Sequence, residues 1–346
     1  MTPVEGIAGD PFTAIQRYYW RIALELKLRK SNGDAFQDFF STVMGLLHGD
    51  DFVRVRPYGA LGDKGCDGYL QSSGQLFQCY GALAGELKQV ATLTTKMTDD
   101  FGKALKNLAA MMKEWHMVHN IADGLPVEAV TTMDVLRTAN PKLVFGIVGI
   151  EGFSDRVFRL QPFQVEALLG PAASETDAST LDAAALRGLV QHLRNEADAI
   201  DFDQQDLRPV PLDKLVYNNL PNHWKQLISG GWKNAHLVGQ YFDRHPDPLA
   251  GERIAKLFRD RYEYLKTQLL RPGDIMASLY ELVTGIGSVP PQKQVAAQSL
   301  LAFLFENCDI FDRLPADEST NLEAAVLDTR LSDKTAGGGL FGFRFG

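Results

Sequence analysis

The stretch VRVRPYGALGDKGCDGYLQSSGQLFQCYGA, residues 53–82, decides the fold that we predict. Apolar and polar residues alternate over residues 52–57 and again over residues 75–80, which is typical of half-buried strands. A third, shorter strand is predicted over residues 67–71, and the turn residues 72–74 join it to the strand that follows. The stretch therefore predicts three consecutive strands, of which the last two form a hairpin.

Helical patterns lie on both sides of these strands, and further strands follow. Helices are predicted over residues 12–30, 34–48, 83–114 and 127–139, and strands over residues 115–120 and 142–150. The resulting order α-α-β-β-β-α-β-α-β predicts a sheet whose later strands are joined by helical crossovers and run parallel. The first part of the chain is therefore predicted to be an α/β domain with a mixed sheet flanked by helices.

Composition changes near residue 170, and the remainder of the chain has a helical pattern. Residues 170–184 are rich in small and polar side chains, which marks a domain boundary. After it we predict helices over residues 181–197, 212–220, 223–227, 235–243, 249–269, 273–284 and 291–307. The predicted division is an α/β domain at 1–170, a linker and connecting helix at 171–210, an all-α domain at 211–315 and a flexible glycine-rich tail at 316–346.

The overall composition is that of an ordinary soluble globular protein. Hydrophobic residues make up 45% of the 346 residues and charged residues 23%, which excludes a disordered or collagenous chain. The net charge of −8 disfavours non-specific nucleic-acid binding unless a local basic surface or a partner supplies positive charge. No signal peptide or membrane-spanning stretch is recognisable, and the three cysteines have no metal-ligand spacing, so we expect a cytoplasmic protein with reduced thiols.

Two oxygen-bearing side chains on neighbouring strands form the candidate site. Asp67 opens a strand after a glycine-rich turn, and Gln78 lies on the next strand across the hairpin. A carboxylate and an amide oxygen that converge in this way can hold a divalent cation. The alternatives are that Asp67 is only a turn residue and that Gln78 is a polar residue on the outer face of the sheet. Asp63 is predicted to form the turn, and Glu25 to be solvated or, alternatively, to face the site.

This arrangement resembles the Mrr-like branch of the PD-(D/E)XK nucleases. The matching positions are Phe36-Gln37 on the second helix, GDKGCDG at residues 62–68 with Asp67 as the metal-binding aspartate, and Gln78-Cys79-Tyr80 on the third strand. The resemblance implies a restriction-endonuclease-like fold that cleaves DNA with Mg²⁺ or Mn²⁺. It also implies that Asp67 is the principal metal ligand, Gln78 the second, and Gln37 a contributor from the helix.

Two positions depart from the nuclease pattern. Gln37 replaces the helix glutamate, and Tyr80 replaces the lysine that in this family positions and deprotonates the metal-bound water. A tyrosine, neutral near pH 7, does this poorly. Either a lysine on the next helix, Lys96 or Lys103, has taken over this role, or catalysis is lost. In the second case the fold serves as a sensor or scaffold that binds nucleic acid or a partner protein.

The end of the helical part carries a second resemblance. AAQSLLAFLFENCDIFDRLP, residues 296–315, resembles the closing segment of proteins from ABC-three-component systems, which are built around an SMC/RecN-type ABC ATPase. The resemblance implies a helical module that docks on partner proteins of a defence operon, so that the chain is a nuclease effector against phages or plasmids. The sequence does not decide whether the chain forms a homo-oligomer. A third reading is a helical adaptor in which the sheet is only a folding platform.

Overall fold

The computed structural model describes residues 10–56, 63–82, 89–197, 217–268, 270–307 and 310–311. Several predictions lie wholly or partly outside these residues. They are Gly62 of the glycine-rich turn, the start of the helix expected over residues 83–114, residues 198–210 of the linker, most of the helix expected over residues 212–220, positions 308–309 and 312–315 of the closing segment, and the tail 316–346.

The first half of the chain is an α/β unit with the predicted order of elements. They are α1 (Ala14–Lys30), α2 (Gly33–His48), the 3-10 helix η1 (Gly49–Asp51), β1 (Phe52–Arg54), β2 (Gly68–Leu70), β3 (Gln75–Tyr80), α3 (Gln89–Leu108), β4 (Glu114–His119), α4 (Val127–Ala139), β5 (Val144–Val148), α5 (Ile150–Val157) and α6 (Pro162–Leu169). Thr13 caps the start of α1, where its side-chain oxygen accepts from the backbone N–H of Gln16.

The five strands form one mixed sheet in the order β1-β2-β3-β4-β5. The pairs β1–β2 and β2–β3 are antiparallel, whereas β3–β4 and β4–β5 are parallel. The hairpin and the parallel crossovers predicted from the sequence are therefore confirmed. Gly74, with a φ of +74°, closes the turn between β2 and β3 in a conformation that favours glycine.

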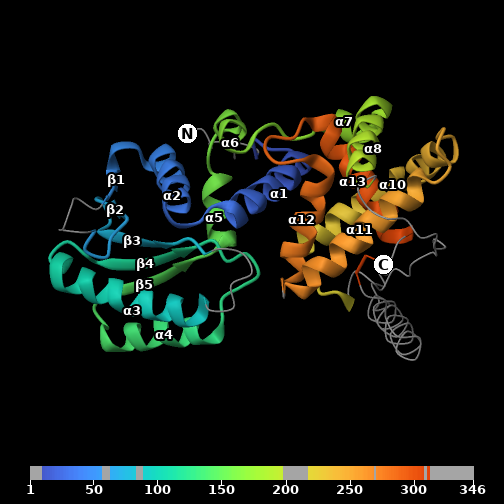
Figure 1. The fold of residues 1–346 in the computed structure, drawn as a ribbon. Coiled ribbons are helices and arrows are strands. Elements are labelled where there is room, and N and C mark those ends of the chain that lie inside the picture. Colours follow the sequence, from blue (N-terminus) through green and yellow to red (C-terminus); the bar gives the residue numbers. More distant parts are fainter. Residues whose placement is uncertain are drawn as a thin grey trace, which may run out of the picture.

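Helices cover both faces of the sheet, and strand alternation divides the core between them. On one face, Leu76 and Tyr80 of β3 pack with side chains of α3 and α4. On the other face, Phe77 and Cys79 pack with side chains of α1, α2 and α5. Figure 1 shows the sheet between these two layers. Even-numbered residues of β3 therefore face α3, which decides the orientation of Gln78.

The second half is helical, as predicted, with some differences in detail. Its elements are α7 (Glu175–Ser179), α8 (Ala183–Ala197), α10 (Asn222–Asp243), α11 (Ala250–Thr267), α12 (Pro272–Thr284) and α13 (Pro291–Asn307). Two helices were predicted, over residues 223–227 and 235–243, where α10 runs unbroken. A Cβ on Gly231 would lie 2.4 Å from the backbone oxygen of Gln298, so glycine lets α10 pack closely on α13.

The first helix belongs to the cores of both halves. Trp20, Leu24 and Leu28 of α1 pack in the cluster between the sheet and helices α2 and α5. Ile22 of the same helix packs in the cluster formed by α8 and α10–α13. In Figure 1, α1 accordingly lies between the sheet and the C-terminal helices.

Candidate functional site

Asp67 directly precedes β2, and Gln78 lies within β3. The backbone N–H of Asp67 donates to the carbonyl oxygen of Phe77 at 2.8 Å. The first ladder pair of the two strands sets Gly68 opposite Phe77 as well. Asp67 and Gly68 therefore both lie against Phe77, the residue before Gln78, on neighbouring segments of the hairpin.

The turn before Asp67 is held against α3 by Gly65. This residue has a φ of +79°, and a Cβ added to it would lie 2.0 Å from the backbone oxygen of Asp100. Only glycine fits both the conformation and the close approach. Asp63 closes the turn, since its Oδ1 accepts from the backbone N–H of Gly65 at 2.9 Å, as expected of a turn-forming residue.

The carboxylate of Asp67 is buried and accepts two hydrogen bonds. Gln37 Nε2 of α2 donates to Oδ1 at 2.8 Å, and the backbone N–H of Cys79 donates to Oδ2 at 2.7 Å. Gln37 Nε2 also donates to the carbonyl oxygen of Val55 at 3.3 Å. These two acceptors orient the Gln37 amide so that its NH₂ group, and not its oxygen, faces Asp67.

Gln78 is a buried amide with an unsatisfied oxygen. Its side chain is 1% exposed, and its Oε1 has no hydrogen-bond partner among the described residues. It lies between Leu76 and Tyr80, whose side chains face α3, so Gln78 faces the same helix. An orphaned buried acceptor costs about 1–3 kcal/mol, which a ligand that supplies positive charge would recover.

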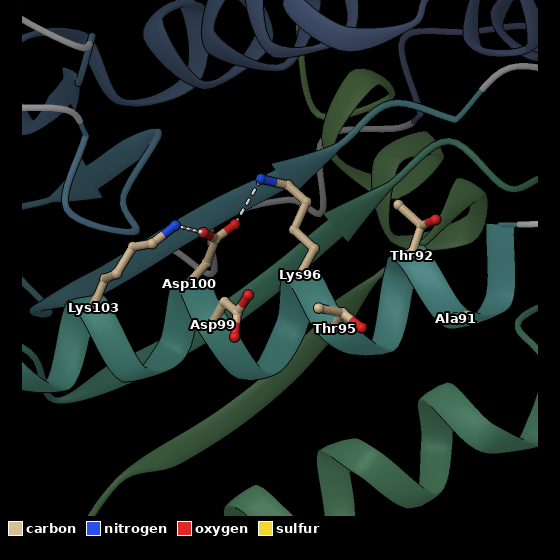
Figure 2. Close-up of a pocket in the computed structure, with 7 residues that line it drawn as sticks. All are labelled: Ala91, Thr92, Thr95, Lys96, Asp99, Asp100 and Lys103. Atoms are coloured by element: carbon tan, nitrogen blue, oxygen red, sulfur yellow. Dashed lines mark hydrogen bonds and ion pairs between the residues drawn. The ribbon is translucent and has the colours of Figure 1, made fainter.

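Both candidate lysines reach the same carboxylate on α3. Lys96 Nζ donates to Oδ2 of Asp100 at 2.6 Å, and Lys103 Nζ donates to Oδ1 at 2.8 Å. Figure 2 shows the two lysines approaching Asp100 from opposite sides along the helix. These side chains line a surface pocket together with Asp99 and Thr95.

The electrostatics connect this helix face with Asp67. Burial is the largest influence on the pKa of Asp67 and raises it to about 6. The nearby carboxylates of Asp63 and Asp100 also raise this pKa, whereas the hydrogen bond from the Cys79 N–H lowers it. Lys96 lowers the pKa of the same carboxyl through its charge. Burial is therefore the main reason that this carboxyl keeps its proton to a higher pH than a solvated aspartate.

The raised pKa of Asp67 predicts how stability depends on pH. Between the unfolded pKa near 3.8 and the folded pKa near 6, the folded chain holds a proton that the unfolded chain has released. We therefore expect the free energy of unfolding, relative to that of Asp67→Asn, to fall by about 3 kcal/mol as pH rises through this window. Urea denaturation of both proteins across the window measures the difference, and a difference that stays constant with pH contradicts the expectation.

Asp67 and Gln78 carry the side-chain oxygens that a divalent cation would need at this place. Within the described part of the chain, no three His, Cys, Asp or Glu side chains gather closely enough to hold a metal ion. A site here relies instead on the carboxylate of Asp67 and the free oxygen of Gln78, both hard ligands. Gln37 offers Asp67 an N–H donor, so in this orientation it supports the carboxylate without presenting an oxygen.

The structure corrects the prediction that Glu25 is solvated or faces the site. Its side chain is 0% exposed, and it lies between the two halves of the chain. Glu25 Oε1 accepts from Trp224 Nε1 at 2.9 Å, while Oε2 contacts Nε2 of His223. Burial would raise the pKa of Glu25, but His223 and Arg29 outweigh burial and hold this pKa below its usual value. The sequence pattern of α1 could not reveal partners that lie about 200 residues away.

Arg29 extends this contact into a buried charge network. Its guanidinium lies 2.7 Å from Glu25 and 2.9 Å from Asp123 in the β4–α4 loop. It also pairs closely with Asp274 on α12. Arg29 is 8% exposed, so these charges are largely withdrawn from water. We call Glu25, Arg29, Asp123 and Asp274 the buried charge network.

Asp100 is the residue at the site that our sequence analysis did not include. Its side chain is almost fully buried, with both oxygens ion-paired. The signal was present in the sequence, since Lys96 and Lys103 lie four residues before and three after it, on one helix face. Buried aspartates are rare unless paired, but burial at this position was not predictable from the pattern alone.

The fold and this site define an α/β unit with a buried acidic centre at a hairpin, followed by a helical module. Residues 184–312 match the family model of C-terminal domain 10 of the ABC-three component systems. No curated protein and no solved structure matches the chain. A domain of such a system implies that this chain works with other protein components. None of the helices in the described ranges combines the length and apolar character that a membrane span requires.

Proposed function

We propose that the α/β unit is a divalent-metal-dependent endonuclease with a restriction-endonuclease-like fold, and that it cuts DNA. The observation that carries the proposal is the pair formed by Asp67 and Gln78. Asp67 directly precedes β2 and Gln78 lies on the adjacent strand β3. The Asp67 carboxyl has a raised pKa, and Gln78 has a buried oxygen without a hydrogen-bond partner among the described residues. The order of helices and strands around them agrees with the PD-(D/E)XK pattern that the sequence resembles.

In this proposal different residues bind the metal ion, orient the Asp67 carboxylate and supply positive charge. Asp67 and Gln78 hold Mg²⁺ or Mn²⁺, which when bound activates water and stabilises charge on a phosphodiester. Gln37 and the backbone N–H of Cys79 fix the orientation of the Asp67 carboxylate. Lys96 supplies, from α3, the positive charge that Tyr80 cannot supply from β3.

The helical module gives the proposal its biological setting. Residues 184–312 match a domain of ABC-three component systems, so we propose that the chain is the effector subunit of a prokaryotic defence system against phages or plasmids. Its partners include an SMC/RecN-type ABC ATPase. Since the chain carries a net charge of −8, such partners would also help to bring it to DNA.

One observation favours a second candidate function, a nuclease-fold sensor or scaffold without catalysis. Gln37 donates directly to Asp67, whereas a glutamate there would need a cation or a proton between the two carboxylates. The Asp67–Gln37 hydrogen bond can thus satisfy the carboxylate without metal. On this alternative the α/β unit binds nucleic acid or the partner ATPase but does not cut.

The decisive experiment uses the full chain, alone and with its partner ATPase, on supercoiled plasmid with Mg²⁺ or Mn²⁺. We expect nicked and linear products that EDTA abolishes, and calorimetric binding of Mn²⁺ that is absent in Asp67→Asn. DNA binding without metal binding or cleavage would support the scaffold instead. Absence of metal binding, DNA binding and cleavage would leave the helical adaptor as the remaining reading.

A further inference from the structure

Asp100 is positioned by the same turn that leads into Asp67. The close approach of Gly65 to the backbone oxygen of Asp100 packs the turn directly against this point of α3. The backbone of Asp100 is therefore fixed relative to the strand that begins after Asp67. A side chain at position 100 has a defined place beside the site, which a residue elsewhere on an exposed helix face would lack.

The Asp100 carboxylate is committed to two ammonium groups. It is 3% exposed, and Lys96 and Lys103 each take one of its oxygens. The two lysines differ in their surroundings. The Lys96 side chain is 34% exposed and that of Lys103 55%, and only Lys96 is among the charges that act on Asp67 and on Cys79.

Lys96 has a long, flexible side chain that needs a fixed partner to remain in one place. A free lysine loses rotamer entropy when it is held in one conformation. The buried carboxylate of Asp100 provides that partner from the same helix, one turn away. Without it, the ammonium group would move into the solvent around the open pocket shown in Figure 2.

We propose that Asp100 is a positioning residue that holds the Lys96 ammonium group on the side of α3 against which the turn before Asp67 packs. Its contribution rests on the proposed function, because it acts on phosphodiester cleavage only through Lys96. The lysine that the nuclease pattern places on the strand is thereby replaced by a two-residue unit on α3. The unit consists of Lys96, which faces the reacting phosphate, and Asp100, which sets its position.

The test is a double-mutant cycle measured as single-turnover cleavage of a labelled DNA duplex by the full chain with Mn²⁺. We expect Asp100→Asn and Lys96→Met each to slow cleavage by about 10-fold or more. The double variant should be no slower than Lys96→Met within a factor of about 2, because Asp100 has no effect once Lys96 is gone. Asp100→Glu, which retains the charge, should recover part of the rate.

The controls separate positioning from structure and from the proposed function itself. Asp134→Asn removes an exposed carboxylate on the neighbouring helix α4, outside the pocket, and should leave the rate unchanged. Mn²⁺ affinity and the thermal unfolding midpoint of Asp100→Asn should stay close to those of the wild type. Losses that multiply in the double variant would overturn the positioning role while leaving the nuclease in place. A wild-type chain that does not cut DNA would overturn both proposals together.

Discussion

Asp67→Asn is expected to lower the rate of metal-dependent DNA cleavage by at least about 10³-fold. The substitution keeps the size of the side chain and one acceptor for the Cys79 N–H, but it removes the negative charge that attracts the cation. Because Asp67 is the one carboxylate in the proposed ligand pair, the loss should resemble removal of the metal. Plasmid cleavage with Mn²⁺ across a concentration series measures the effect.

Asp63→Asn is the matched control for this prediction. Asp63 lies in the same turn, carries the same charge and also raises the pKa of Asp67. Asparagine can still accept from the backbone N–H of Gly65, so the turn should persist. We expect its rate to remain within about 3-fold of the wild type. Equal cleavage by Asp67→Asn and the wild type would remove Asp67 from the site.

Arg29→Ala is expected to lower the free energy of unfolding by about 3–5 kcal/mol, the cost of breaking a buried ion pair. The substitution leaves Glu25, Asp123 and Asp274 close together without the cation that neutralises them. The network connects α1 with the β4–α4 loop and with α12, so the loss should weaken the contact between the two halves. Urea denaturation followed by tryptophan fluorescence measures it.

Lys30→Ala provides the comparison for Arg29. Lys30 is the next residue of α1 and pairs with Glu281 of α12, but its side chain is 41% exposed. An exposed pair of this kind contributes at most about 1 kcal/mol. If Arg29→Ala costs no more than Lys30→Ala, the buried charge network does not stabilise the contact between the halves.

The sheet was predictable because its determinants are local. Alternation over residues 75–80 and the turn residues before them define the hairpin without reference to the rest of the chain. The short helices α5, α6 and α7 were not predicted, since their few turns leave little periodic signal. The split predicted in α10 was wrong, since the helix continues through Gly231, which packs closely on α13.

The candidate site was predictable in its residue types but only partly in its geometry. The sequence pattern proposed Asp67 and Gln78, and the resemblance proposed the two lysines; the structure places Asp67 directly before β2 and Gln78 within β3. The direction of the Gln37 amide and the burial of Asp100 depend on contacts between separate elements. No periodicity or spacing encodes such contacts, so they appear only in the folded chain.

Helix α1 packs in the hydrophobic cores of both halves, which limits where the chain can be cut into fragments. A fragment that begins at residue 171 would keep all the C-terminal helices but would lose Ile22 and Glu25, leaving their apolar and ionic partners uncovered. We expect such a fragment to aggregate and to be poorly soluble. Adding the first helix as a synthetic peptide should increase its solubility. The C-terminal helices therefore cannot be joined to a different N-terminal domain unless that domain brings a helix equivalent to α1.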